Sequence, residues 1–352
     1  NELPQHAFVE ARDNSLGSKW HAGSASLCEL ILPKSLTGIS PGAFIDCKAL
    51  SKVYTKDGSE LLSENDAIVY TKDKKRLVQV APGYCGSFEV PSSVTIIDSC
   101  ALMDATFSYL RFKSGKLPKI YNSSLVNAAY IIAIDAADCA IAFPEADCVE
   151  SIETITVNNV QSGTLLETIG NKGYTRKNVR SVTVTGTLNA DDISALCSLP
   201  NLYYADLSGA RIASTSTKII FKDSKLVDVK MPSGSYHLVV QDNPYMCGEL
   251  CIPEGVYALD YKNARHSSVS FPSTLRDMKS FSNNRIIERV DLSACSNMTS
   301  LSAFYGCAKL EELILPSALE ILSDVYAPIK RVEFPKGLKY WKACNGWEIE
   351  SL

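Results

Sequence analysis

Imidazole bases are scarce in this chain, which bears on whether it can act as an enzyme. Its 352 residues include four histidines, His6, His21, His237 and His266. A serine or cysteine nucleophile needs a base held beside it, and no histidine here lies in a pattern that indicates such a pair. The sequence also lacks G-x-x-x-x-G-K-S/T and a G-x-G-x-x-G that follows a strand. We therefore expect a non-enzymatic protein that needs no cofactor.

Twelve cysteines raise the alternatives of disulfides or a metal site. Cys47 and Cys307 occupy equivalent positions in two copies of a repeat described below, and Ala105 takes that place in a third copy. The position requires a small buried residue, so we predict that both cysteines are free thiols. Cys247 and Cys251 are four residues apart and could either pair or lie on a strand. Because no further ligands at zinc spacing are nearby, we predict no metal.

The charged and apolar residues exclude other classes of protein. Asp191 and Asp192 are adjacent and would point to different faces, so they are better suited to the start of a helix than to catalysis. The formal net charge is -4 and the basic residues are scattered, which argues against a nucleic-acid partner. The most apolar stretch, 128–143, contains Asp135 and Asp138 and is too short to span a bilayer. We expect no transmembrane segment.

A repeated apolar frame runs through the chain and must position whatever residues bind a ligand. Each copy has a large apolar residue, Pro, two small or polar residues, an aliphatic residue, two more residues and another apolar one. Six copies begin at Leu32-Pro33, Val90-Pro91, Ile252-Pro253, Phe271-Pro272, Leu315-Pro316 and Phe334-Pro335. Such self-similarity is the signature of a repeat array.

The repeat period and its internal alternation predict the fold. Equivalent positions recur after 19 or 23 residues, for example from Pro253 to Pro272 and from Leu27 to Leu50. The residues before each Pro alternate with period two, as in a half-buried strand, and Pro ends the strand. We predict a leucine-rich-repeat solenoid, a β-rich α/β fold in which short parallel strands stack into a curved sheet with an irregular or short-helical convex side.

The repeat also has a specific resemblance. Segment 32–53, L-P-K-S-L-T-G-I-S-P-G-A-F-I-D-C-K-A-L-S-K-V, resembles the repeat of BspA-like leucine-rich repeat proteins, which are surface proteins of host-associated anaerobic bacteria. Residues 63–82 resemble the hairpin insert of that family. The residues alone agree, because 67–70 and 76–80 are strand-like and a polar turn, 72–75, joins them.

The segments between the repeats indicate two modules. Residues 117–153 resemble the end cap of such an array, with a strand, a short helix and a final strand, and the text that follows resembles the start of a new array. We therefore predict one module at 1–153, whose residues 1–26 are an unassigned leader, and a second at 154–352. Trp341 and Trp347 are expected to cap the last repeat.

Strand parity identifies the residues that should project from the concave sheet face, which solenoids use for partners. Any single one of these could be an ordinary solvated residue, but as a row they are the best candidate ligand-binding surface. They are Lys52, Tyr54, Glu89, Arg111, Tyr204, Asp206, Arg289, Asp291, Glu312, Ile314, Arg331 and Glu333.

Function follows from the resemblance more than from any residue. It implies an extracellular or cell-surface bacterial protein, from which a signal peptide or lipid anchor has been trimmed, that adheres to a protein or glycan macromolecule such as host matrix. A carbohydrate-binding component of a surface nutrient system would instead show an aromatic platform or a close carboxylate pair. A structural spacer would show neither. The sequence leaves the oligomeric state open.

Overall fold

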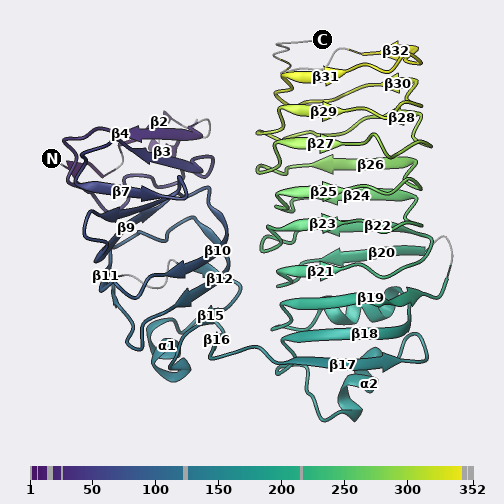
Figure 1. The fold of residues 1–352 in the computed structure, drawn as a ribbon, viewed down its shortest axis with the longest axis horizontal. Coiled ribbons are helices and arrows are strands. Elements are labelled where there is room, and N and C mark those ends of the chain that lie inside the picture. The colour runs from purple at the N-terminus through teal and green to yellow at the C-terminus, as the bar shows by residue number, and fades with distance from the viewer. Residues whose placement is uncertain are drawn as a thin grey trace. The chain divides into compact units, whose positions relative to one another are not determined.

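The structure is a computed structural model that describes residues 2–5, 7–13, 19–24, 27–121, 126–214, 217–342 and 347. The chain divides into two compact units, residues 1–151 and 152–352 (Figure 1). The sequence analysis placed a module boundary near residue 153. Each unit has its own buried apolar core.

The described residues of the first unit form short sheets and one helix. Two of its parallel pairs are β1 (Glu2–Leu3) with β5 (Gly38–Ile39) and β4 (Glu29–Leu32) with β6 (Lys52–Thr55). β2 (Val9–Asp13) pairs antiparallel with β3 (Lys19–Gly23). One larger sheet has the order β13 (Lys119–Ile120), β11 (Ile96–Ile97), β9 (Arg76–Val80), β8 (Ile68–Thr71), β7 (Leu61–Glu64). The other runs β10 (Cys85–Val90), β12 (Thr106–Phe112), β15 (Ile131–Ile132), β16 (Cys148–Val149), with β14 (Asn127–Ala128) beside β12.

The insert and the end cap of the first unit have recognisable local causes. β8 and β9 form an antiparallel hairpin whose turn contains Lys74 at a φ of 53°. After β15, Asp135 accepts hydrogen bonds from the backbone N–H groups of Ala137 and Asp138 at 3.0 Å, and α1 (Ala136–Ala142) begins there. β16 follows α1, so this segment contains a strand, a short helix and a final strand.

The second unit is a solenoid of parallel strands in two stacks (Figure 1). One stack contains β17 (Thr154–Asn159), β18 (Ser181–Leu188), β19 (Tyr204–Ile212), β21 (Asp228–Lys230), β23 (Glu249–Cys251), β25 (Ser268–Ser270), β27 (Arg289–Asp291), β29 (Glu312–Ile314) and β31 (Arg331–Glu333). The other contains β20 (Thr217–Lys222), β22 (Tyr236–Gln241), β24 (Ala258–Lys262), β26 (Asp277–Ser282), β28 (Ser300–Leu301), β30 (Ile321–Leu322) and β32 (Tyr340–Trp341). Its described helices are α2 (Leu165–Asn171) and α3 (Ala190–Cys197).

The predicted solenoid of stacked parallel strands is confirmed, and the second stack is a detail that the prediction lacked. Where short helices or irregular structure were expected, most repeats of this unit form a strand instead. The reason is visible in β20, where Ile219 and Phe221 are buried and the alternating residues Lys218, Ile220 and Lys222 are exposed. This period-two burial suits a strand rather than a helix.

Hydrogen bonds at the start of α3 connect the first repeats of this unit. Asn189 and Asp192 form a capping box, each side chain accepting the other residue's backbone N–H. The buried Asp192 carboxylate also accepts from the backbone N–H groups of Gly163 at 2.7 Å and Leu165 at 3.0 Å. The expectation that Asp191 and Asp192 begin a helix is therefore confirmed.

Candidate binding surface

The short strands in the β17 to β31 stack of the second unit bury their middle side chain and turn the two flanking ones outward. In β27, β29 and β31 the middle residues Val290, Leu313 and Val332 are buried in the core. The register places Arg289, Glu312 and Arg331 in one outward row. Asp291, Ile314 and Glu333 form the neighbouring row. The structure thus brings six of the predicted site residues together on one sheet.

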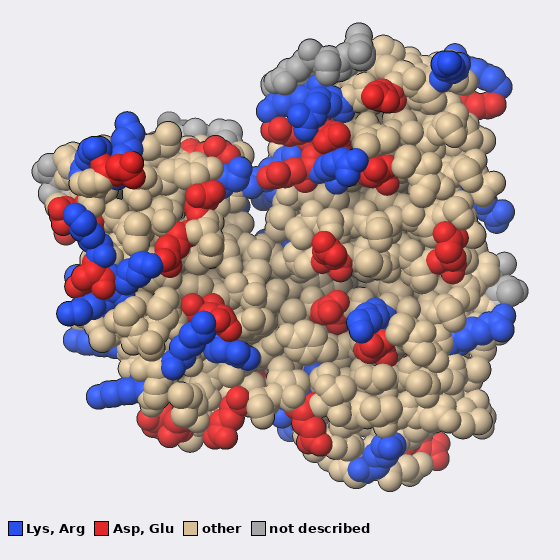
Figure 2. Space-filling view, in the orientation of Figure 1, with Lys and Arg blue, Asp and Glu red and all other residues tan. Residues whose placement is uncertain are grey.

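Ion pairs connect the side chains of these rows. Arg289 Nη2 lies 3.0 Å from Asp291 Oδ2, and its Nε lies 3.5 Å from Glu312 Oε1. Arg331 Nη2 approaches the other oxygen of Glu312 at 3.1 Å. Hydrogen bonds from Ser293, together with Arg289, hold the pKa of Asp291 below its ordinary value. Figure 2 shows charged side chains of both signs gathered over this part of the second unit.

The predicted pair on β19 lies further toward the start of the same stack. Ala205 and Leu207 are buried, and the alternating residues Tyr204 and Asp206 project outward. Asp206 accepts a hydrogen bond from Ser208 Oγ at 2.6 Å and pairs with Lys230 Nζ at 2.9 Å. Both contacts lower the pKa of Asp206, Ser208 having the larger effect.

The four predicted residues of the first unit lie on two separate sheets. Lys52 on β6 pairs with Glu29 on β4 at 2.9 Å, and Tyr54 follows on the same face. On β10 and β12, Glu89 lies 3.4 Å from Arg111 Nη1. The structure therefore does not join these four into one row.

Strand parity also shows outward residues that the sequence analysis missed. β21, β23 and β25 fill the gap between β19 and β27, since β21 lies next to β23 and β25 next to β27. We use the name strand face for one set of outward residues on this stack from β19 to β31: Tyr204, Asp206, Asp228, Lys230, Glu249, Cys251, Ser268, Ser270, Arg289, Asp291, Glu312, Ile314, Arg331 and Glu333. The signal was available, because β21, β23 and β25 are each followed by an apolar residue and Pro, as in Met231-Pro232.

One histidine has a carboxylate partner, on the opposite stack. His237 Nε2 lies 3.1 Å from Asp260 Oδ2, and Ser280 Oγ donates to Asp260 Oδ1 at 3.1 Å. The carboxylate stands between the hydroxyl and the imidazole, so this geometry does not let His237 deprotonate Ser280. Burial lowers the pKa of His237 despite the nearby carboxylate. His6 and the side chain of His21 lie outside the described part of the chain.

The prediction that Cys47 and Cys307 are buried free thiols is confirmed. Cys251 is a free thiol on the exposed side of β23, so it lies on a strand and does not pair with Cys247. Over the described residues, no group of three or more His, Cys, Asp and Glu side chains could hold a metal ion.

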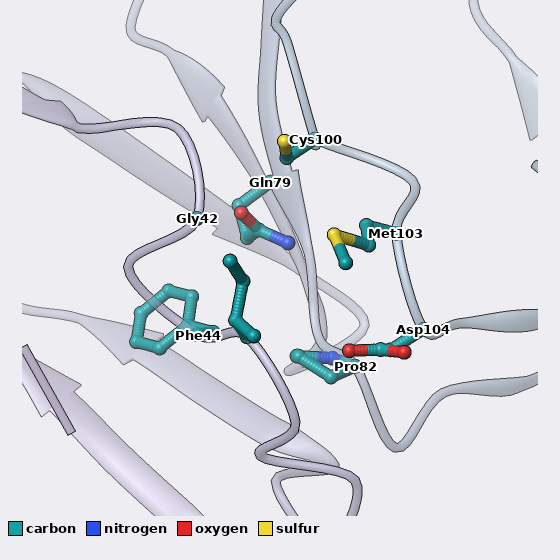
Figure 3. Close-up of a pocket in the computed structure, with 8 residues that line it drawn as sticks. Gly42, Phe44, Gln79, Pro82, Cys100, Met103 and Asp104 are labelled. Atoms are coloured by element: carbon teal, nitrogen blue, oxygen red, sulfur yellow. The ribbon is translucent and has the colours of Figure 1, made fainter. Parts of the chain in front are cut away.

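Small cavities and the last repeat add little to the candidate surface. The cavity in Figure 3, lined by Gln79, Cys100, Met103 and neighbouring residues, has a volume of about 10 Å³ and has room for at most about one water molecule.

At the C-terminal end, Trp347 stacks on Phe334 with ring centroids 6.1 Å apart and covers it, while Trp341 stays half exposed.

Comparison with known proteins finds one matching family model, and its repeats agree with this architecture. The BspA type leucine rich repeat region matches residues 9–66 and 256–344 in six copies. The first match begins inside the leader that the sequence analysis left unassigned. A solved leucine-rich repeat protein from Eubacterium ventriosum ATCC 27560 is similar, at 15% identity over 93% of this chain and a TM-score of 0.23. The chain covers 60% of that protein's length. No curated protein matches the chain.

Fold and repeats together define a repeat-protein scaffold of the kind that presents an extended surface for interactions. Residues 9–66 and 256–344 carry BspA-type leucine-rich repeats, so the predicted resemblance is confirmed. Within the described ranges, no helix is long and apolar enough to cross a membrane.

Proposed function

We propose that this chain is a non-enzymatic, secreted or cell-surface binding protein that adheres to a macromolecule through its strand face. The observation that supports the proposal most is the continuity of this face. Successive strands from β19 to β31 present at least two outward side chains each, with alternating charges at one end and the small residues Cys251, Ser268 and Ser270 in the middle. The resemblance to bacterial surface proteins supports the proposed location and the attachment to host matrix.

Charge arrangement favours a folded protein as the partner. The row Arg289, Glu312, Arg331 alternates in sign, and its two arginine side chains remain more than half exposed although they are paired. Exposed ion pairs add little stability, so a partner can exchange them for its own charges at small cost. Arginine is enriched among residues that dominate protein interfaces. A nucleic acid would need a field of one sign, which these rows lack.

Binding of the full chain to immobilised collagen, laminin and fibronectin tests the proposal. We expect Tyr204→Ala, Asp291→Ala and Arg331→Ala to weaken binding, and Glu312→Arg to weaken it at least tenfold, because it sets three like charges side by side. Glu320→Arg is the matched control, since Glu320 forms a comparable ion pair with Lys339 at 2.7 Å beside the opposite stack. If every strand-face variant bound as well as the parent chain, the strand face would not be the binding surface. If the parent chain bound none of the three proteins, the proposed adhesion to host matrix would be contradicted.

A further inference from the structure

The first unit contains a cavity unrelated to the strand face, with a volume of about 230 Å³. At roughly 30 Å³ per molecule of liquid water, this is space for about eight waters. Residues from six separate segments line it: Glu2, Thr37, Gly38, Ile39, Pro41, Thr71, Arg76, Val78, Asp98, Ser99 and Tyr121. The cavity is thus a product of the tertiary structure of this unit.

The outer face of one sheet contributes most of the polar groups. β9, β11 and β13 run parallel in a register that aligns Arg76, Ile96 and Lys119. Two residues further along each strand direction, Val78, Asp98 and Tyr121 follow on the same face. Val78 and Asp98 would be exposed on an uncovered sheet, yet they are 3% and 8% exposed. The neighbouring segment 37–41 and Glu2 line the same cavity beside them.

The cavity brings acceptors and donors together. Arg76 Nε donates a hydrogen bond to Asp98 Oδ1, and the Arg76 side chain remains about half exposed, at 53%. Burial raises the pKa of Asp98, while Arg76 acts in the opposite direction. Glu2 lies on β1, next to its partner Gly38 on the adjacent strand β5, and adds a second carboxylate to the cavity.

An aromatic ring completes the lining. Tyr121 is 44% exposed, and Lys119 Nζ lies 4.7 Å from its ring centroid. The ammonium group covers one face of the ring, so a ligand has the other face or the edge available. Glu2 and Asp98 are balanced by Arg76 and Lys119, so neither an anion nor a cation is favoured by net charge.

We infer that this cavity binds a single neutral sugar residue. Each sugar hydroxyl both donates and accepts a hydrogen bond, which matches carboxylates and a guanidinium placed side by side. The C–H groups of a pyranose ring pack against an aromatic face. Small-ligand sites combine apolar lining with a few convergent polar groups. Here most of the lining residues are polar, and Ile39, Pro41 and Val78 supply the apolar part.

Ligand-observed NMR titration of the full chain with the methyl glycosides of glucose, galactose and mannose tests this inference. We expect at least one of the three to bind, and Tyr121→Ala to weaken it at least tenfold. Asp98→Asn, which keeps the shape of the side chain, is expected to weaken it severalfold. Tyr109→Ala is the matched control, because Tyr109 on β12 is a tyrosine of the same unit that does not line the cavity.

The comparison ligands are glucuronic acid and glucosamine, which add a negative and a positive charge to the same ring. Preference for either charged sugar over the neutral glycosides would overturn the inference, as would binding of none of the three glycosides. Binding that Tyr121→Ala and Asp98→Asn leave unchanged would place the sugar elsewhere and would also overturn it. Glu312→Arg should not alter this titration, so the outcome is independent of the strand-face proposal.

Discussion

The rings of Tyr261 and Phe281 lie 4.2 Å apart, centroid to centroid, and within 9° of parallel. They belong to the neighbouring strands β24 and β26, and Phe304 continues the contact at 5.2 Å from Phe281. All three side chains are fully buried. Aromatic contacts therefore connect successive repeats of the second unit through its core.

Removing the central ring should destabilise the second unit strongly. We expect Phe281→Ala to lower its free energy of unfolding by about 3–5 kcal/mol, because it leaves a cavity between two aromatic neighbours. Tyr305→Ala, at a side chain that is 67% exposed, should change it by less than about 0.5 kcal/mol. Urea unfolding followed by circular dichroism measures both. A loss below about 1 kcal/mol for Phe281→Ala would contradict this account.

Gly255 should tolerate no side chain, since two repeats approach closely there. Its φ is +101°, and a Cβ at this position would lie 2.1 Å from the carbonyl oxygen of Gly234. We expect Gly255→Ala to cost at least about 2 kcal/mol. Gly248→Ala is the control, because a Cβ there meets no atom within 4 Å. Equal thermal unfolding temperatures for the two variants would contradict the close approach of the two repeats at Gly255.

The buried His266 should make stability depend on pH. Its Nδ1 lies 3.1 Å from Tyr261 Oη, and burial lowers its pKa to about 4 from 6.5. Because the folded-state pKa is the lower one, the unfolded chain binds more protons between pH 6.5 and 4. Stability is therefore fully present above pH 6.5 and falls through this window, by about 3 kcal/mol from this group.

Unfolding free energies of the chain and of His266→Gln at pH 7 and pH 5 measure that contribution. The variant should lose less stability between the two pH values than the parent chain does. Carboxylates with lowered pKa values, such as Asp242 beside Asn263, affect both proteins alike. Parallel pH profiles for parent and variant would exclude His266 as a source.

Thiol reactivity should separate the exposed from the buried cysteines. Burial raises the pKa of Cys295 and of Cys307 to about 12, so neither forms an appreciable thiolate at neutral pH. Cys251 is exposed on β23. A short treatment with iodoacetamide at pH 8, read by peptide mass spectrometry, should modify Cys251 and leave the other two intact until urea is added. Prompt modification of Cys307 in the folded chain would contradict its buried position.

Local patterns in the sequence predicted much of the fold. Alternation before each Pro predicted strands such as β29 and β31 and the outward position of Glu312 and Arg331, because side chains on a strand alternate faces with period two. A polar turn between two strand-like runs predicted the β8–β9 hairpin. The equivalence of Cys47 and Cys307 predicted two buried free thiols.

Lateral neighbours were decided only by the tertiary structure. Alternation states which face a side chain takes, but the residue beside it belongs to the next repeat, and that register depends on the combined geometry of the intervening turns. Arg289 therefore meets Glu312 across 23 residues, and Asp98 shares a cavity with Glu2, Arg76 and Tyr121 from separate segments. The sequence alone determined that the chain is a solenoid of stacked strands, since that follows from local periodicity. The rows and the cavity through which it could bind were decided by long-range packing.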